Sequence, residues 1–107
     1  MRQTIDLVLR AATEHTAAAL RDHVARRLSF AMRRYEHHVG RVTVRLVDLN
    51  GPKRGVDSRC SMTLELVGGG RIMAEATTAV PFGAVTRAAS RLKAALRREL
   101  KRAASHM

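Results

Sequence analysis

Four segments of the chain alternate apolar and polar residues with a period of two. Because successive side chains of an extended strand point to opposite faces, each segment predicts a strand with one buried face. The predicted strands span residues 4–9, 41–46, 60–67 and 71–76. The apolar positions expected to face the core are Ile5, Leu7, Leu9, Val42, Val44, Leu46, Cys60, Met62, Leu64, Leu66, Ile72, Ala74 and Ala76.

Two longer segments repeat apolar residues every three or four positions, which is the spacing of an amphipathic helix. The first helix is predicted from Thr16 to Glu36. The second is predicted from Pro81, whose fixed φ suits the first helical turn, to Ala103. The buried stripes expected on the two helices are Ala17, Leu20, Val24, Leu28, Ala31 and Tyr35, and Val85, Ala89, Leu92, Leu96, Leu100 and Ala103.

The connections between these elements indicate the topology. A helix between the first two strands favours a right-handed parallel crossover. Residues 50–57 are dense in turn formers and predict a loop, and Gly68–Gly70 supply the positive φ of a tight hairpin. The last three strands are therefore expected to run antiparallel. The order β-α-β-β-β-α predicts an α+β, two-layer domain: a mixed four-stranded sheet with two helices packed on one face and the other face solvated.

The length of 107 residues suits one domain, and a 46% hydrophobic content is enough for a core. We expect this domain to span residues 1–104. Two origins remain open for the tail at residues 105–107, natural sequence or a cloning remnant. The single Cys60 excludes an internal disulfide, and no segment has the apolar run of a signal peptide or a membrane span, so we expect a cytoplasmic protein.

Charge narrows the class of partner. The chain has 20 Lys and Arg against 9 Asp and Glu, a formal net charge of +11, and seventeen of the bases are Arg, whose planar fork suits phosphate. The second predicted helix bears seven bases and one acid, Glu99, so its self-repulsion calls for an external anion. One row, within about 60° around this helix, is Arg87, Arg91, Arg98 and Arg102. The adjacent row is Lys93, Arg97 and Lys101.

The first predicted helix offers a second basic surface. Arg26 and Arg33 flank Phe30 and His37 on the side away from the buried stripe. The margin of this surface carries Arg27 and Arg34, and the loop adds Lys53 and Arg54. Two interpretations of Phe30 remain open: its ring stacks on an unpaired RNA base, or it packs under a neighbouring loop.

Motifs for catalysis or metal binding are not found in the sequence. Gly68–Gly70 lie between two predicted strands and lack the spacing and the helix of a dinucleotide site. His37 and His38 would point about 100° apart on a helix, with no further ligand at zinc spacing. Cys60 alternates with core positions and is expected to be a buried thiol. We therefore expect no enzyme, no metal site and no cofactor.

Three motifs occur in an order that resembles a known family. They are Leu20-Arg21-Asp22-His23-Val24 followed by Leu28; Gly69-Gly70 followed by Ile72, Ala74 and Glu75; and Phe82-Gly83-Ala84-Val85 with Arg91-Leu92, Leu96 and Arg98. Together they cover nearly the whole chain. With the loop at residues 50–57 and the segment Arg26–Ala31, the sequence is similar to the short, single-domain form of the ribosome hibernation-promoting factors, also called ribosome-associated inhibitors or sigma-54 modulation proteins.

The resemblance implies a bacterial stress-response protein that binds the small ribosomal subunit and its rRNA. It would occupy the channel of messenger and transfer RNA and exclude both without catalysis. The C-terminal domain with which long members pair ribosomes is expected to be missing. Four features depart from the family pattern: Ala94 stands where a base is usual, Phe82 replaces Tyr, the first-helix aromatic comes one residue late at Tyr35, and a base expected near Phe30 is absent. Because of these departures, two interpretations stay open: a full inhibitor and a degenerate paralogue. The alternatives are a general double-stranded-RNA module and an adaptor that meets an acidic protein.

Overall fold

A computed structural model describes residues 1–10, 12–49 and 57–105 of the chain. Along the chain, these residues form β1 (Arg2–Val8), α1 (Glu14–Met32), the short 3₁₀ helix η1 (Arg33–His38), β2 (Val39–Asp48), β3 (Ser58–Leu66), β4 (Arg71–Thr78) and α2 (Pro81–Ala104). The predicted order of β-α-β-β-β-α is confirmed, with η1 added after the first helix. Lys53, Arg54 and the rest of the predicted loop at residues 50–56 lie outside the described residues, as do His106 and Met107 of the tail.

The four strands form one mixed sheet in the order β1-β2-β3-β4. β1 pairs with β2 in parallel, and the two later pairings are antiparallel. The register aligns alternating apolar positions across all strands: Ile5 lies beside Val44, Val44 beside Met62, and Met62 beside Ala74. The predicted α+β architecture follows from this alignment, because a single apolar face is left to be covered.

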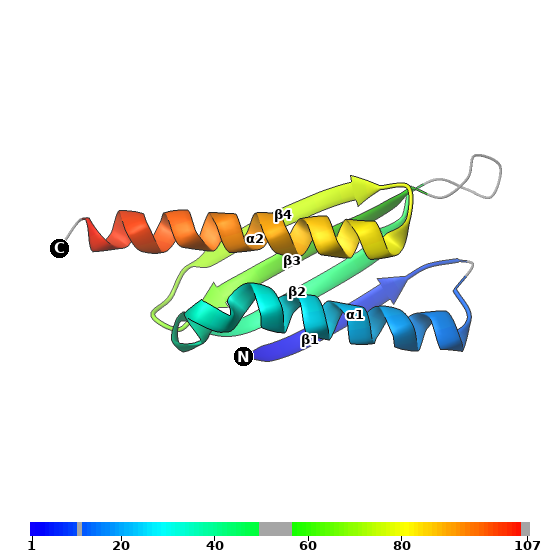
Figure 1. The fold of residues 1–107 in the computed structure, drawn as a ribbon, viewed down its shortest axis with the longest axis horizontal. Helices are drawn as coiled ribbons and strands as arrows, with labels where there is room; N and C mark the ends of the chain where they lie inside the picture. Colours follow the sequence, from blue (N-terminus) through cyan, green and yellow to red (C-terminus); the bar gives the residue numbers. More distant parts are fainter. Residues whose placement is uncertain (11, 50–56, 106–107) are drawn as a thin grey trace.

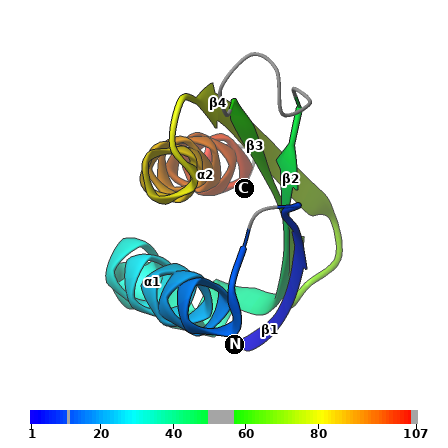
Figure 2. The same cartoon turned by 90° about the vertical axis from the view of Figure 1, so that its right-hand side faces the viewer.

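Both helices cover that face and lie side by side, so the molecule has two layers (Figure 2). They begin at the same end of the sheet and run in the same direction, with α1 on the β1 side and α2 over β3 and β4 (Figure 1). Leu20, Val24 and Leu28 of α1, and Leu92 and Leu96 of α2, are fully buried between the layers. None of the described helices carries an apolar stretch long enough to cross a bilayer.

The predicted end of the first helix is wrong. The α-helix stops at Met32, and residues 33–38 continue as a 3₁₀ helix in which Tyr35 leaves helical geometry, at φ −122° and ψ 15°. The cause is tertiary, because the chain must turn so that Val39, which is 3% exposed, can enter the sheet beside Leu66. Tyr35 still packs against the core as predicted.

Two further predictions need correction. Ala103, which the helical period predicts in the buried stripe, is exposed, because the last turns of α2 extend past the end of the sheet (Figure 1). Leu9 lies just beyond β1, although it packs against the core. The predicted hairpin is confirmed: Gly69 and Gly70 have φ of 99° and 100°, a region that glycine reaches without a Cβ clash.

Candidate nucleic-acid interface

The basic residues of α2 divide between two neighbouring elements. Arg87, Lys93 and Arg97 form the α1-side flank: Arg87 lines a hollow with Arg27 of α1, Lys93 reaches Phe30 of α1, and Arg97 follows Lys93 by one turn. The β4-side flank comprises Arg91, Arg98 and Arg102. Lys101 lies on the exposed final turns. The predicted row of Arg87, Arg91, Arg98 and Arg102 is thus distributed over both flanks.

An exposed aromatic ring lies at the junction of the two helices. Phe30 is 59% exposed, so no described loop covers it, and the interpretation in which it packs under a loop is not supported. The guanidinium carbons of Arg27 and Arg33 each lie 5.7 Å from the ring centroid, and Nζ of Lys93 lies 5.9 Å from it. Each distance is within the range of a cation–π contact. We call these four residues the Phe30 cluster.

Arg27 links the Phe30 cluster to the hollow between the helices. Its side chain is half-buried, and its Nε is buried without a hydrogen-bond partner among the described residues. The hollow is lined by Arg27, Phe82, Gly83, Thr86, Arg87 and Ser90. A buried donor without a partner is uncommon in a folded protein, and here it adjoins a surface rich in positive charge.

His23 fixes the spacing of the helices at the other end of this hollow. Its Nε2 lies 3.2 Å from the carbonyl oxygen of Phe82 and 3.0 Å from Oγ1 of Thr86, and the Thr86 hydroxyl donates to the same carbonyl at 3.1 Å. Because a carbonyl only accepts, Nε2 carries the proton. The His23 and Phe82 rings also meet edge to face, with centroids 5.2 Å apart. These contacts tie α1 to the first turn of α2.

The environment of His23 favours its neutral form. Burial lowers the pKa of His23, and the nearby positive charges of Arg27 and Arg26 lower it further, against the opposing effect of the bond to the Phe82 carbonyl. In the sequence, His23 stands out only as part of the Leu20–Val24 motif. Its spacing of four residues from Arg27 is the one sequence feature that indicates a place beside the basic surface, since residues four apart lie on the same side of a helix.

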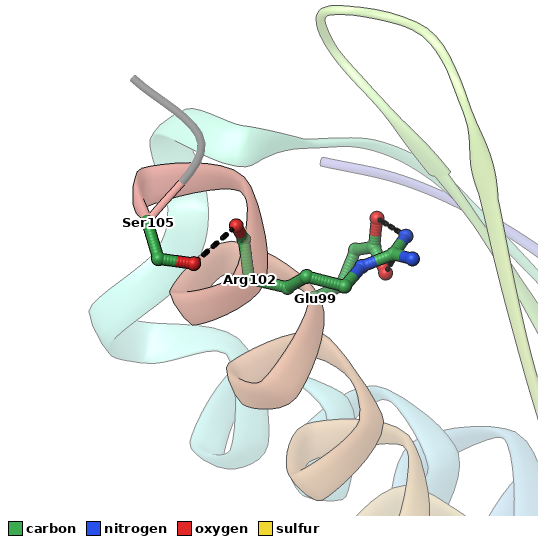
Figure 3. A network of polar contacts seen from close by, with 3 residues as sticks. All are labelled: Glu99, Arg102 and Ser105. Atoms are coloured by element: carbon green, nitrogen blue, oxygen red, sulfur yellow. Dashed lines mark hydrogen bonds and ion pairs between the residues drawn. The ribbon is translucent and has the colours of Figure 1, made fainter.

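On the β4-side flank, two of the three arginines have partners within the chain. Nη1 of Arg91 donates to the carbonyl oxygen of Glu75 on β4 at 2.8 Å. Nη2 of Arg102 donates to both carboxylate oxygens of Glu99, at 2.7 and 2.9 Å, and the Arg102 carbonyl accepts from the Ser105 hydroxyl (Figure 3). Within the described residues, Arg98 has no ion pair.

The remaining predicted site residues are on the surface. Arg26 is exposed and pairs with Asp22 at 3.3 Å, and Arg33 and Arg34 are exposed on η1. His37 and His38 are also exposed, and no group of three or more potential metal ligands occurs in the part of the chain that the structure describes. Cys60 is fully buried, which confirms the predicted buried thiol, and this burial raises its pKa to about 12.

These features define a class: a two-layer α+β domain that presents a cationic helical surface with an exposed aromatic ring. Residues 5–104 match the family model described as sigma 54 modulation protein / S30EA ribosomal protein, and the chain belongs to this family. The family is ribosome-associated, and its members bind the ribosome and are not enzymes. The resemblance drawn from the sequence motifs is confirmed.

Solved structures with the same fold support this assignment. The N-terminal domain of Protein Y from Thermus thermophilus is 25% identical, with a TM-score of 0.67, and the match covers 92% of this chain and 98% of that domain. A ribosomal subunit interface protein from Coxiella burnetii is 15% identical, with a TM-score of 0.68 and the same coverage, and shows the shared fold. Among curated proteins, none matches the chain.

Proposed function

We propose that this protein is a hibernation factor that binds rRNA of the small ribosomal subunit near the decoding channel and sterically excludes messenger and transfer RNA. Its place would be the bacterial cytoplasm under stress. Membership of a ribosome-binding family supports the general function. The single observation that carries the finer proposal is the Phe30 cluster, which joins an exposed ring to one cation each from α1, η1 and α2.

The chemistry of the Phe30 cluster suits a nucleotide with an unpaired base. An exposed ring offers a stacking surface worth about 1–3 kcal/mol per base. The cations that surround it suit the adjoining phosphates, and such contacts position a protein without reading the sequence. A protein side chain that packed on Phe30 would leave the three positive charges without anions. The cluster therefore favours RNA over an apolar partner.

The proposed RNA surface extends from this centre along both helices. Its residues are Arg26, Arg27, Arg33, Arg34, Arg87, Arg91, Lys93, Arg97, Arg98, Lys101 and Arg102. The α1-side flank contributes the inner contacts beside Phe30, and the β4-side flank and the final turns of α2 contribute the outer positive field. Because each phosphate contact releases bound counterions, we expect binding to weaken steeply with salt.

Sedimentation with isolated ribosomal subunits tests this proposal. The wild-type protein should pellet with the small subunit at about 0.1 M salt, should be released at higher salt, and should be displaced by excess transfer RNA. Equal binding to both subunits and to a plain RNA duplex would contradict the proposal and support a general double-stranded-RNA module. Binding that survives nuclease treatment and needs no RNA would support the protein adaptor.

A further inference from the structure

The outer edge of β4 is open to solvent. β4 is the last strand in the sheet order, and no described strand pairs with its second edge. Two contacts show which backbone groups point outward. The Leu66 amide donates to the Gly70 carbonyl in the hairpin, so by alternation Ile72, Ala74 and Ala76 face β3. The Glu75 carbonyl instead accepts from Arg91, so Arg71, Met73, Glu75 and Thr77 present their backbone groups outward.

A groove of about 440 Å³ runs between this edge and the second half of α2. Its lining residues are Arg71, Ile72, Ala95, Arg98, Glu99 and Arg102. Ile72 and Ala95 give it an apolar component, and three arginines give it positive charge. The groove therefore combines a strand edge, a small apolar surface and guanidinium groups.

Two contacts within the chain resemble those that an added strand would make. Arg91 donates to the outward carbonyl of Glu75, which is the role of a backbone N–H in a neighbouring strand. Glu99 accepts both bonds from one guanidinium nitrogen of Arg102, which is the role of an acidic side chain in the groove (Figure 3). The outward carbonyls of the edge can therefore accept hydrogen bonds, and the guanidinium groups of the groove can bind a carboxylate.

We propose that the β4 edge and its groove bind an extended, acidic segment of another polypeptide, which adds to the sheet as a fifth strand. Main-chain hydrogen bonds to the outward groups of Met73 and Thr77 would give affinity, and every second side chain of the segment would face α2. Acidic residues at those positions meet Arg98, which lines the groove and has no ion pair within the described residues. With eight residues in β4, a segment of about five or six residues is long enough.

The charges at the edge favour this occupant over two others. A second copy of the chain would bring its own positive groove against this one, and each copy already carries a formal net charge of +11. Nucleic acid makes little use of outward backbone amides and carbonyls, whereas a polypeptide strand pairs with both. An acidic peptide uses the amides, the carbonyls and the arginines together.

The test uses fluorescence anisotropy of a labelled synthetic peptide that alternates Val and Glu, added to the full chain. Met73 is 69% exposed and its N–H points outward, so Met73→Pro removes one donor to the peptide without removing a donor within the sheet. We expect Met73→Pro to weaken peptide binding about fivefold or more, and Met73→Ala, which keeps the N–H, to change it less than about twofold. Equal affinities of the two variants would overturn the proposal.

Charge provides a second comparison that does not depend on proline. Arg98→Glu on the β4-side flank should weaken binding of the Val-Glu peptide, and Arg97→Glu on the α1-side flank should leave it nearly unchanged. A peptide that alternates Val and Lys should not bind. If both variants weaken binding equally, or if the Val-Lys peptide binds as well, the contact is general electrostatic attraction and the proposal fails.

Hydrogen exchange of the wild-type protein locates the contact directly. The amides of Met73 and Thr77 should gain protection when the Val-Glu peptide is added, and unchanged exchange there would contradict strand addition. This result is independent of the proposed ribosome binding. Met73→Pro should still pellet with the small subunit. The peptide experiments and the sedimentation experiment can therefore fail separately, and each tests one proposal.

Discussion

The two flanks of α2 carry similar arginines and lysines but differ in what surrounds them. On the α1-side flank, Lys93 shares one aromatic ring with Arg27 and Arg33, and no acid of the described residues pairs with any of the three. On the β4-side flank, Arg91 bonds to a strand carbonyl and Arg102 bonds to Glu99. The number of positive charges on a helix therefore does not tell which of them are available to a partner.

The difference has an energetic basis. Three cations within about 6 Å of one ring repel one another, and exposed cation–π contacts of about 0.5–1 kcal/mol each offset that repulsion only in part. An anion bound at the Phe30 cluster would relieve it. The arginines with internal partners gain less from an added anion, because they would exchange one acceptor for another.

Reversing two charges of the Phe30 cluster gives the largest expected effect. Arg33→Glu combined with Lys93→Glu should weaken binding to the small subunit by about 100-fold and reduce its dependence on salt, since two phosphate contacts become repulsive. The matched control is Arg2→Glu with Arg59→Glu, which makes the same change in net charge on exposed positions of the strands. Sedimentation of both double variants measures the difference. If the control variant loses as much affinity for the small subunit, binding depends on total charge and not on the Phe30 cluster.

Removing the ring at the centre of the cluster should have the next largest effect. Phe30→Ala should weaken binding to single-stranded rRNA by about 1–3 kcal/mol through loss of stacking, and Phe30→Trp should retain binding. The melting temperature should change little, because the ring is 59% exposed. Titration of a fluorescent RNA oligonucleotide gives the affinities. Unchanged binding by Phe30→Ala would contradict a stacking role for this residue.

A pair of arginines separates structural from binding roles on the same helix. Arg91→Ala should lower the free energy of unfolding by about 1 kcal/mol, because the bond to the Glu75 carbonyl is lost. Arg87→Ala should leave stability nearly unchanged and should weaken subunit binding more than Arg91→Ala does. Urea unfolding and sedimentation measure the two quantities. If Arg87→Ala lowers the free energy of unfolding more than Arg91→Ala does, the assignment of a structural role to Arg91 and a binding role to Arg87 is wrong.

The sequence predicted the two layers because its two periods, two in the strands and three to four in the helices, report burial directly. It also predicted Phe30, Arg27 and Arg33 as members of one surface, because all three belong to neighbouring turns of one segment. The sequence did not predict which basic residues of α2 belong to the α1-side flank and which to the β4-side flank. A helical repeat gives angles around one axis, and it does not say which side of that axis faces α1 and which faces β4 until the strand order is known.

The contacts that the sequence did not reveal join residues far apart in the chain. Arg91 meets a backbone carbonyl of Glu75, and a carbonyl carries no sequence signal. Lys93 meets Phe30 only because α1 and α2 lie side by side. The end of α1 at Met32 was missed for a related reason, since the entry of Val39 into the sheet, and not local propensity, ends the helix.

The smallest expected effect concerns the contact that sets the distance between α1 and α2. The pKa of His23 is lowered in the folded protein from an ordinary value of 6.5. Between the lowered value and 6.5, the unfolded chain binds more protons at this site than the folded chain, so the free energy of unfolding should fall as pH falls through that window and stay constant above it. Urea unfolding of the wild type and of His23→Gln, compared from pH 7.5 down to 5, isolates this contribution. Because the added charge would lie beside Arg27, subunit binding should strengthen as His23 becomes protonated, so its pH dependence is opposite in sign to that of stability. If the free energies of unfolding of the wild type and of His23→Gln change with pH in parallel, protonation of His23 does not weaken its bond to the Phe82 carbonyl. The contact between α1 and α2 would then be independent of pH, and the two flanks of α2 would differ only in the partners of their basic residues.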